Sequence, residues 1–143
     1  NAMADFTLLL KERVLLNGTE RGTDYVLTIP NIENYDNRIV TVPSGSETTI
    51  FQYSNTPGAG TFTSGSFKYG RISNYSTTTP INLKVSSSSE LMNFKIDAGG
   101  TFMLSTSDIT GSLTNTFTYN DINSVFVEPS GSSAKVEYFI ATT

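Results

Sequence analysis

The most constraining feature of this chain is a series of short runs, between residues 67 and 105, in which apolar and polar side chains alternate. In the run Ile81–Ser86, Ile, Leu and Val occupy every second position, and Asn, Lys and Ser lie between them. Alternation with a period of two places the apolar side chains on one face of a β-strand. A strand of this kind covers a core on one side only, which is typical of antiparallel sheets. The chain is therefore predicted to be all-β.

Similar runs, bounded by Gly, Pro, Asn or Ser, occur along most of the chain. We predict strands within segments 23–32, 37–43, 48–54, 66–76, 80–90, 91–100, 101–106 and 122–141, with short strands at 61–63 and 116–119. Pro30 and Pro43 are predicted to close two of these strands, because proline cannot donate to a ladder. Segment 6–19 mixes Leu with charged residues and ends in the turn pair Asn17-Gly18, so it is predicted to be strand or irregular.

This pattern predicts a single domain, residues 3–143, because 143 residues provide one sizeable core. Asn1 and Ala2 are interpreted as the remnant of an expression tag ahead of Met3. Roughly eight to eleven strands, with no helices to cover a parallel sheet, favour an antiparallel two-sheet β-sandwich, most economically a jelly roll. The turn at 129–132 is predicted to join its flanking strands as a hairpin. Phe126 and Phe139 are then expected on the face opposite the core, where one of them is a candidate subunit contact.

The Gly pair in the segment Phe94–Ser105 allows two interpretations. Asp97 and the glycine backbone are the elements of a ligand loop, but the local sequence gives Asp97 no His, Cys, second carboxylate or helix terminus as a partner. We therefore predict a corner between two strands, in which Gly99 and Gly100 adopt positive φ and Asp97 bonds the turn backbone.

The residues that the chain lacks exclude most catalytic and metal chemistry. It has no His and no Cys, so it offers neither a Ser-His-Asp nor a Cys-His nucleophile, and sites for zinc, copper or iron are not expected. We predict no catalytic residues, no cofactor and no metal. The Asp and Asn residues in 34–38 and 119–123 are calcium-type ligands, but they fit turns better than a full calcium loop. The carboxylates lie mostly beside turns, so a glycosidase pair is also not favoured.

Charge and hydropathy narrow the expected partners. The net charge is −4 and the nine Lys and Arg are scattered, so we expect no nucleic-acid binding. The apolar run 6–10 is interrupted by charges and is too short to span a membrane or to serve as a signal peptide, so we expect synthesis in the cytoplasm without export. With 21 Thr and 18 Ser, the polar surface is expected to be mainly hydroxyl and amide.

A group of residues in the segment Lys68–Ser76 suggests recognition of a sugar. Tyr rings stack on sugars, while Arg and Asn side chains offer hydrogen bonds. A carbohydrate-binding or receptor-binding module is therefore the alternative function, with the candidate glycan-binding residues Tyr69, Arg71, Asn74 and Tyr75. The competing interpretation is that both tyrosines are ordinary strand residues.

The passage Gly70–Ser105 contains a strand ending in an Asn turn, then I-x-L-x-V, then F-x-I-x-x-G-x-x-F-x-L. This order resembles small jelly-roll structural proteins of tailed bacteriophages, and it covers 36 of the 143 residues. The resemblance implies a non-enzymatic virion component, either head decoration or a tail or neck protein. It also implies a homo-oligomer, with a trimer favoured, that contacts other virion proteins such as capsid or tail. The family offers no catalytic residues to transfer to this chain.

Overall fold

The computed structural model describes residues 4–53, 61–62, 67–87, 91–105 and 122–143. Within these ranges the chain forms β-strands and no helix, so the predicted all-β fold with antiparallel sheets is confirmed. The strands are β1 (Ala4–Leu16), β2 (Thr19–Ile32), β3 (Asn34–Val42), β4 (Thr48–Tyr53), β5 (Thr61–Phe62), β6 (Phe67–Asn74), β7 (Ile81–Ser87), β8 (Leu91–Ile96), β9 (Thr101–Ser105), β10 (Ile122–Pro129) and β11 (Ala134–Thr142). The strand predicted at 116–119 lies outside the described residues.

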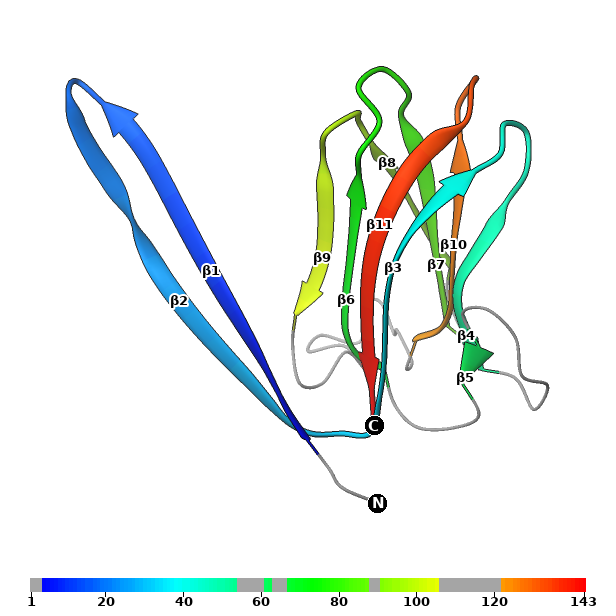
Figure 1. Cartoon of the computed structure of the whole chain (residues 1–143), viewed down its shortest axis with the longest axis horizontal. Coiled ribbons are helices and arrows are strands. Elements are labelled where there is room, and N and C mark those ends of the chain that lie inside the picture. Colours follow the sequence, from blue (N-terminus) through cyan, green and yellow to red (C-terminus); the bar gives the residue numbers. More distant parts are fainter. Residues whose placement is uncertain (1–3, 54–60, 63–66, 88–90, 106–121) are drawn as a thin grey trace, which may run out of the picture.

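Two of the sheets stack on each other (Figure 1). One has the strand order β5-β4-β10-β7-β8 and the other β3-β11-β6-β9. Every pairing is antiparallel except the short one between β4 and β5. Of the sequential neighbours among β3–β11, only β4–β5 and β7–β8 pair within one sheet, and the other connections cross between the sheets.

Alternating side chains from both sheets form the core. Ile81, Leu83 and Val85 are each at most 1% exposed, as the pattern on this strand predicts. They pack with inward residues of the opposite sheet in a single cluster that includes Val136, Tyr138 and Ile140. At its open edge, Phe94 on β8 contacts Phe102 on β9, with ring centroids 4.9 Å apart.

The predicted hairpin at the C-terminus is wrong. Val125 and Val127 do face the core, but β10 pairs with β4 and β7, whereas β11 pairs with β3 and β6. The turn at 129–132 therefore joins two sheets. Alternation and turn residues have the same appearance in a hairpin and in a corner between sheets, so the local sequence does not specify the partner strand.

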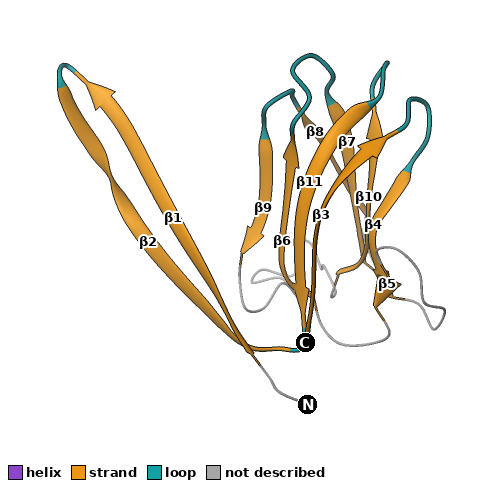
Figure 2. Ribbon diagram, viewed as in Figure 1, coloured by secondary structure: helices purple, strands orange, loops and turns teal. Residues whose placement is uncertain are grey.

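The first two strands form a long hairpin that projects from the sandwich, and we call this hairpin the arm (Figures 1 and 2). Its turn lies at Asn17 and Gly18, whose φ angles are 52° and 77°. Two successive positive φ values are what a two-residue hairpin turn of type I′ requires, and Asn-Gly is the pair best suited to it. The segment 6–19 is thus ordered as the arm's first strand and its turn.

The base of the arm packs on the outer face of the four-stranded sheet, which is the face turned away from the core. Phe6, Leu8, Leu27 and Ile29 from the arm form a second apolar cluster with outward residues of β6, β9 and β11. Here β2 does not end at Pro30 as predicted, but continues to Ile32 across a register irregularity. An irregularity of this kind accommodates a proline, because one residue leaves the ladder.

Candidate functional site

The outward positions of β6 and β11 bring a polar cluster together on the outer face, beyond the base of the arm. On β11, Glu137 and Phe139 face outward because Val136, Tyr138 and Ile140 face the core. Ser73 lies directly across from Glu137, and Arg71 lies across from Phe139. Register alone therefore places Arg71 and Glu137 diagonally on one face, within reach of each other.

The cluster is held by short charged contacts. Arg71 Nη2 lies 2.6 Å from Glu137 Oε1, and Arg71 Nη1 donates to Ser73 Oγ at 2.5 Å. The hydroxyl of Tyr75 donates to Glu137 Oε2, so the carboxylate binds a different donor with each oxygen. Both members of the ion pair are largely covered, with side-chain exposures of 24% and 17%. Such charge-assisted contacts hold the two strands and the following turn in a fixed geometry.

These contacts shift the ionisation of each group. The hydrogen bonds from Tyr75 and then Arg71 lower the pKa of Glu137, because they favour its charged form. The same bond to Glu137 raises the pKa of Tyr75. Burial is the largest single influence on Arg71 and opposes its charge, but the hydrogen bond and the charge of Glu137, together with the smaller contributions of Tyr69 and Tyr75, outweigh burial and leave the pKa of Arg71 raised. The arrangement therefore keeps a carboxylate, a guanidinium and a neutral phenol together at neutral pH.

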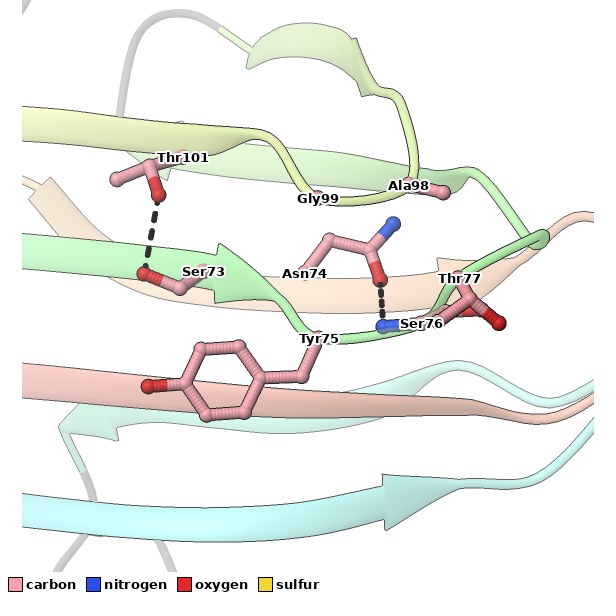
Figure 3. Close-up of a pocket in the computed structure, with 8 residues that line it drawn as sticks. All are labelled: Ser73, Asn74, Tyr75, Ser76, Thr77, Ala98, Gly99 and Thr101. Atoms are coloured by element: carbon pink, nitrogen blue, oxygen red, sulfur yellow. Dashed lines mark hydrogen bonds between the residues drawn. The ribbon is translucent and has the colours of Figure 1, made fainter.

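An open pocket of about 470 Å³ lies beside this cluster, where the turn after β6 meets the corner before β9 (Figure 3). Its lining consists of hydroxyl, amide and small side chains with one aromatic ring: Ser73, Asn74, Tyr75, Ser76, Thr77, Ala98, Gly99 and Thr101. Thr101 Oγ1 donates to Ser73 Oγ at 3.2 Å, which links the pocket to the cluster through Ser73. Polar groups of this kind suit hydrogen bonding to a neutral polar ligand.

The corner that the sequence predicted forms one wall of this pocket. Gly99 has a φ of 80°, as predicted, but Gly100 is not in the left-handed region. A Cβ on Gly100 would lie 3.1 Å from Asp97 O, so a larger residue there would need its neighbours to shift by a few tenths of an ångström. Asp97 bonds the turn through its backbone oxygen, which accepts from Gly100 N at 2.9 Å, and its side chain pairs with Lys95.

The four candidate glycan-binding residues lie in different environments. Tyr69 is 2% exposed because Phe6 of the arm covers its ring. Asn74 is 1% exposed and its side chain bonds the backbone around it. Arg71 is partly covered and paired with Glu137. Tyr75 is 49% exposed and lies at the pocket, so it is the one of the four whose ring is open to a ligand.

Glu137 and Ser73 are the members of the cluster that the sequence analysis missed. Glu137 lies 66 residues from Arg71, so local spacing gives no indication of the pair. The alternation of β11 does contain a signal, since a charged residue at an outward position is expected to find a partner on the neighbouring strand.

A second group of ionisable residues lies at the edge strand β3. The hydroxyl of Tyr138 donates to Asp36 Oδ2 at 3.1 Å, and Arg38 Nε lies 2.9 Å from Asp36 Oδ1. Burial, followed by the charge of Asp36, raises the pKa of Tyr138 to about 12. This group anchors the edge of the sandwich, because the tyrosine also belongs to the core.

The described ranges contain neither a metal-binding cluster nor a membrane-spanning helix. They contain no group of three or more His, Cys, Asp or Glu residues arranged to hold a metal ion. The segment 119–123, whose Asp and Asn residues were predicted to serve a turn, lies partly outside these ranges. No helix in the described part of the chain is long and apolar enough to cross a membrane.

Compared with protein-family models, curated proteins and solved structures, the chain matches none of them. The function of the chain is therefore inferred from the geometry of the arm, the outer face and the pocket.

Proposed function

We propose that this chain is a non-enzymatic structural component of a bacteriophage virion, either a capsid decoration protein or a tail or neck protein, that acts through protein–protein assembly. The observation that carries the proposal is the arm, which projects from the sandwich (Figure 1). Its large apolar side chains are open to solvent. Leu9 and Leu15 are 73% and 75% exposed. Large apolar side chains that remain exposed on one projecting element mark a contact with another macromolecule.

The strand order supports the same proposal. Without the arm and β5, the two sheets read β3-β11-β6-β9 and β4-β10-β7-β8, with most connections crossing between them. We infer that this is a jelly roll, which consists of eight strands in two such sheets and is common in viral capsid domains. This agrees with the resemblance of Gly70–Ser105 to structural proteins of tailed phages. The fold alone does not decide function, so the arm remains the principal argument.

Quantitative mass spectrometry of purified particles, from the system that encodes the chain, tests this proposal. We expect the chain in the particles at a constant ratio to the major capsid or tail protein, because a structural component has a copy number fixed by symmetry. Portal, capsid or tail genes beside its own would agree with this result. Absence from particles that contain their full set of other proteins would overturn the proposal.

The pocket favours a second candidate function, which is glycan binding by the same sandwich. Tyr75 offers a half-exposed ring beside hydroxyl and amide groups. On a glycan array we expect a bound sugar to be lost in Tyr75→Ala and retained in Tyr35→Ala, which removes an exposed tyrosine on the same outer face. An array on which the wild-type protein binds no sugar would reject this function.

A further inference from the structure

The arm carries apolar side chains in its lower part and at its tip, with a charged section that contains Lys11, Glu12 and Arg13 between them. Near the sandwich, Phe6, Leu8, Leu27 and Ile29 are covered by the outer face. Farther out, uncovered large side chains continue on both sides of the hairpin: Leu9, Val14, Leu15, Leu16, Tyr25 and Val26. Because the cross-strand pairs place Leu9 with Val26 and Leu10 with Tyr25, adjacent rows point to opposite faces. Both faces of the outer half of the arm therefore lack cover from this chain.

An apolar recess lies at the base of the arm, where the arm meets the sandwich. It has a volume of about 220 Å³ and is lined by Phe6, Ile32, Tyr35, Phe139 and Ala141, with Ala4 and Asp5 at its margin. Tyr35 stacks on Phe139 with ring centroids 5.9 Å apart, yet it is 70% exposed. The recess is large enough for a leucine or valine side chain and has few polar groups to hold water.

The arm's own tip does not reach this recess. The 13 residues of β1 span about 43 Å at the rise of an extended strand, and the recess lies at the near end of that span. One chain therefore exposes an apolar projection at one end of a rigid hairpin and an apolar recess at the other. A second copy of the chain offers a recess for the projection of the first copy and a projection of the same kind, so it is the partner that fits both surfaces.

We propose, resting on the assembly function above, that the tip of the arm in one copy of this chain inserts Leu16, with Val14 beside it on the same face, against the recess at the base of the arm in a second copy. The contact is head to tail, because the tip and the recess are different surfaces. Contacts of this type close into a ring when the rotation between copies permits it, which is the geometry of a cyclic oligomer such as a trimer.

The apolar surface available is that of a small contact. The six uncovered arm side chains leave roughly 100 Å² each in water, and Tyr35 and Ile39 bring the exposed apolar surface of the arm and the outer face to about 800 Å². In a head-to-tail contact the arm of one copy and the outer face of the next share this total, which is about half of what a standard interface buries, so we expect association at micromolar concentrations. The opposite β-sheet does not compete as the docking surface, since in its strands β4, β7, β8 and β10 the large exposed apolar side chains are Leu91 and Phe94. The arm and the outer face therefore hold most of the apolar surface available for assembly.

Light scattering after size exclusion tests the contact on the full chain. We expect a mass that is a small multiple of 15.5 kDa at 100 µM wild-type protein. We expect the double variant Val14→Lys/Leu16→Lys to fall to a single 15.5 kDa unit, while its thermal transition stays within about 2 °C of wild type because both side chains lie outside the apolar clusters of their own chain. A wild-type monomer, or a double variant that keeps the wild-type mass, would overturn the proposal.

Cross-linking tests which surfaces meet. The chain contains no Cys, so single-Cys variants report one position each. Under oxidation, a mixture of Leu16→Cys and Tyr35→Cys is expected to give a mixed disulfide dimer several-fold more abundant than a mixture of Leu16→Cys and Leu91→Cys, where Leu91 is a similarly exposed residue of the other sheet. Equal yields would place the arm elsewhere and overturn the head-to-tail contact. The contact and the virion role can fail separately. If the chain is a monomer and is still incorporated into particles, the contact is rejected and the virion role remains. If the chain forms the arm-linked oligomer but is absent from particles, the virion role is rejected and the contact remains.

Discussion

The ring of Phe6, near the start of β1, lies 4.4 Å from the ring of Tyr69 on β6, measured between centroids. Phe6 also contacts Phe139 on β11, at 5.4 Å. These contacts bury Tyr69 and orient the arm relative to the sandwich. A two-stranded hairpin is marginally stable by itself, so the arm depends on this docking at its base.

Phe6→Ala is therefore expected to loosen the arm without unfolding the sandwich. The half-buried ring is worth about 2 kcal/mol, less than the 3–5 kcal/mol of a fully buried phenylalanine. Hydrogen exchange measured by mass spectrometry should rise in residues 4–32 and stay unchanged in β7 and β10. Thr7→Ala, on the other face of the same strand, serves as the control and should leave exchange in the arm as in wild type. Unaltered exchange in the Phe6 variant would mean that the base contacts do not hold the arm.

Glu137→Gln is expected to lower stability in a way that depends on pH. The pKa of Glu137 is lowered in the fold, so on acidification the unfolded chain takes up this proton first. The stabilisation from its charge is therefore fully present above the ordinary pKa of 4.5 and disappears as pH falls through the lowered value. We expect a melting temperature roughly 3–5 °C below wild type at pH 7, and a smaller difference near pH 2.

The control for this experiment is Glu33→Gln, which changes an exposed carboxylate in the link between β2 and β3. Its melting temperature should follow wild type at both pH values. If the Glu137 variant lost the same stability at pH 7 and at pH 2, the loss would come from packing and not from the charged contacts with Tyr75 and Arg71.

The strands of the sandwich were predictable from the sequence because the alternation within each strand indicates which of its faces is buried. Ile81, Leu83 and Val85 are recognisable as core residues from three alternating positions. Pairing across the fold was less accessible, since the strands flanking the turn at 129–132 have suitable patterns for a hairpin but belong to different sheets. Which strands pair is decided by the closure of the whole core, and a local pattern contains no information about this.

The candidate site was also predictable only where its residues lie close together in the sequence. The sequence places Tyr69, Arg71, Asn74 and Tyr75 close together on one strand and the turn that follows it. It does not reveal that a hairpin about 60 residues earlier covers Tyr69, or that Glu137 binds both Arg71 and Tyr75. Those contacts join distant segments, so they become visible only in the folded chain.

Gly99→Val is expected to destabilise the fold through the backbone alone. At φ 80° an L side chain is strained, and a Cβ added there would meet no atom within 4 Å, so steric clash contributes nothing. The expected loss is about 1–2 kcal/mol in chemical denaturation. Gly99→Asn should lose less, because asparagine tolerates the left-handed region. Equal stability of Gly99→Val and wild type would show that the corner does not depend on this conformation.

Asn74 connects the two loops that form the pocket, and its replacement is expected to have the largest effect of these substitutions. Its Nδ2 donates to the carbonyl oxygens of Thr79 at 2.9 Å and Ile96 at 3.2 Å, while its Oδ1 accepts from Ser76 N at 3.0 Å. The side chain is 1% exposed, so Asn74→Ala leaves buried backbone groups without partners. We expect a loss of about 2–4 kcal/mol in urea denaturation.

Two further variants separate hydrogen bonding from bulk at this position. Asn74→Asp keeps the size of the side chain but places a carboxylate against carbonyl oxygens at neutral pH, so it should be at least as unstable as the alanine variant. On acidification the neutral carboxyl becomes a donor, and part of the lost stability should return. Asn82→Ala, at an exposed position of β7, should change stability by less than about 0.5 kcal/mol. If Asn74→Ala cost no more than Asn82→Ala, the turn and the corner would be held by their backbone contacts, in which Asn74 N donates to Gly100 O and Gly99 N donates to Asn74 O.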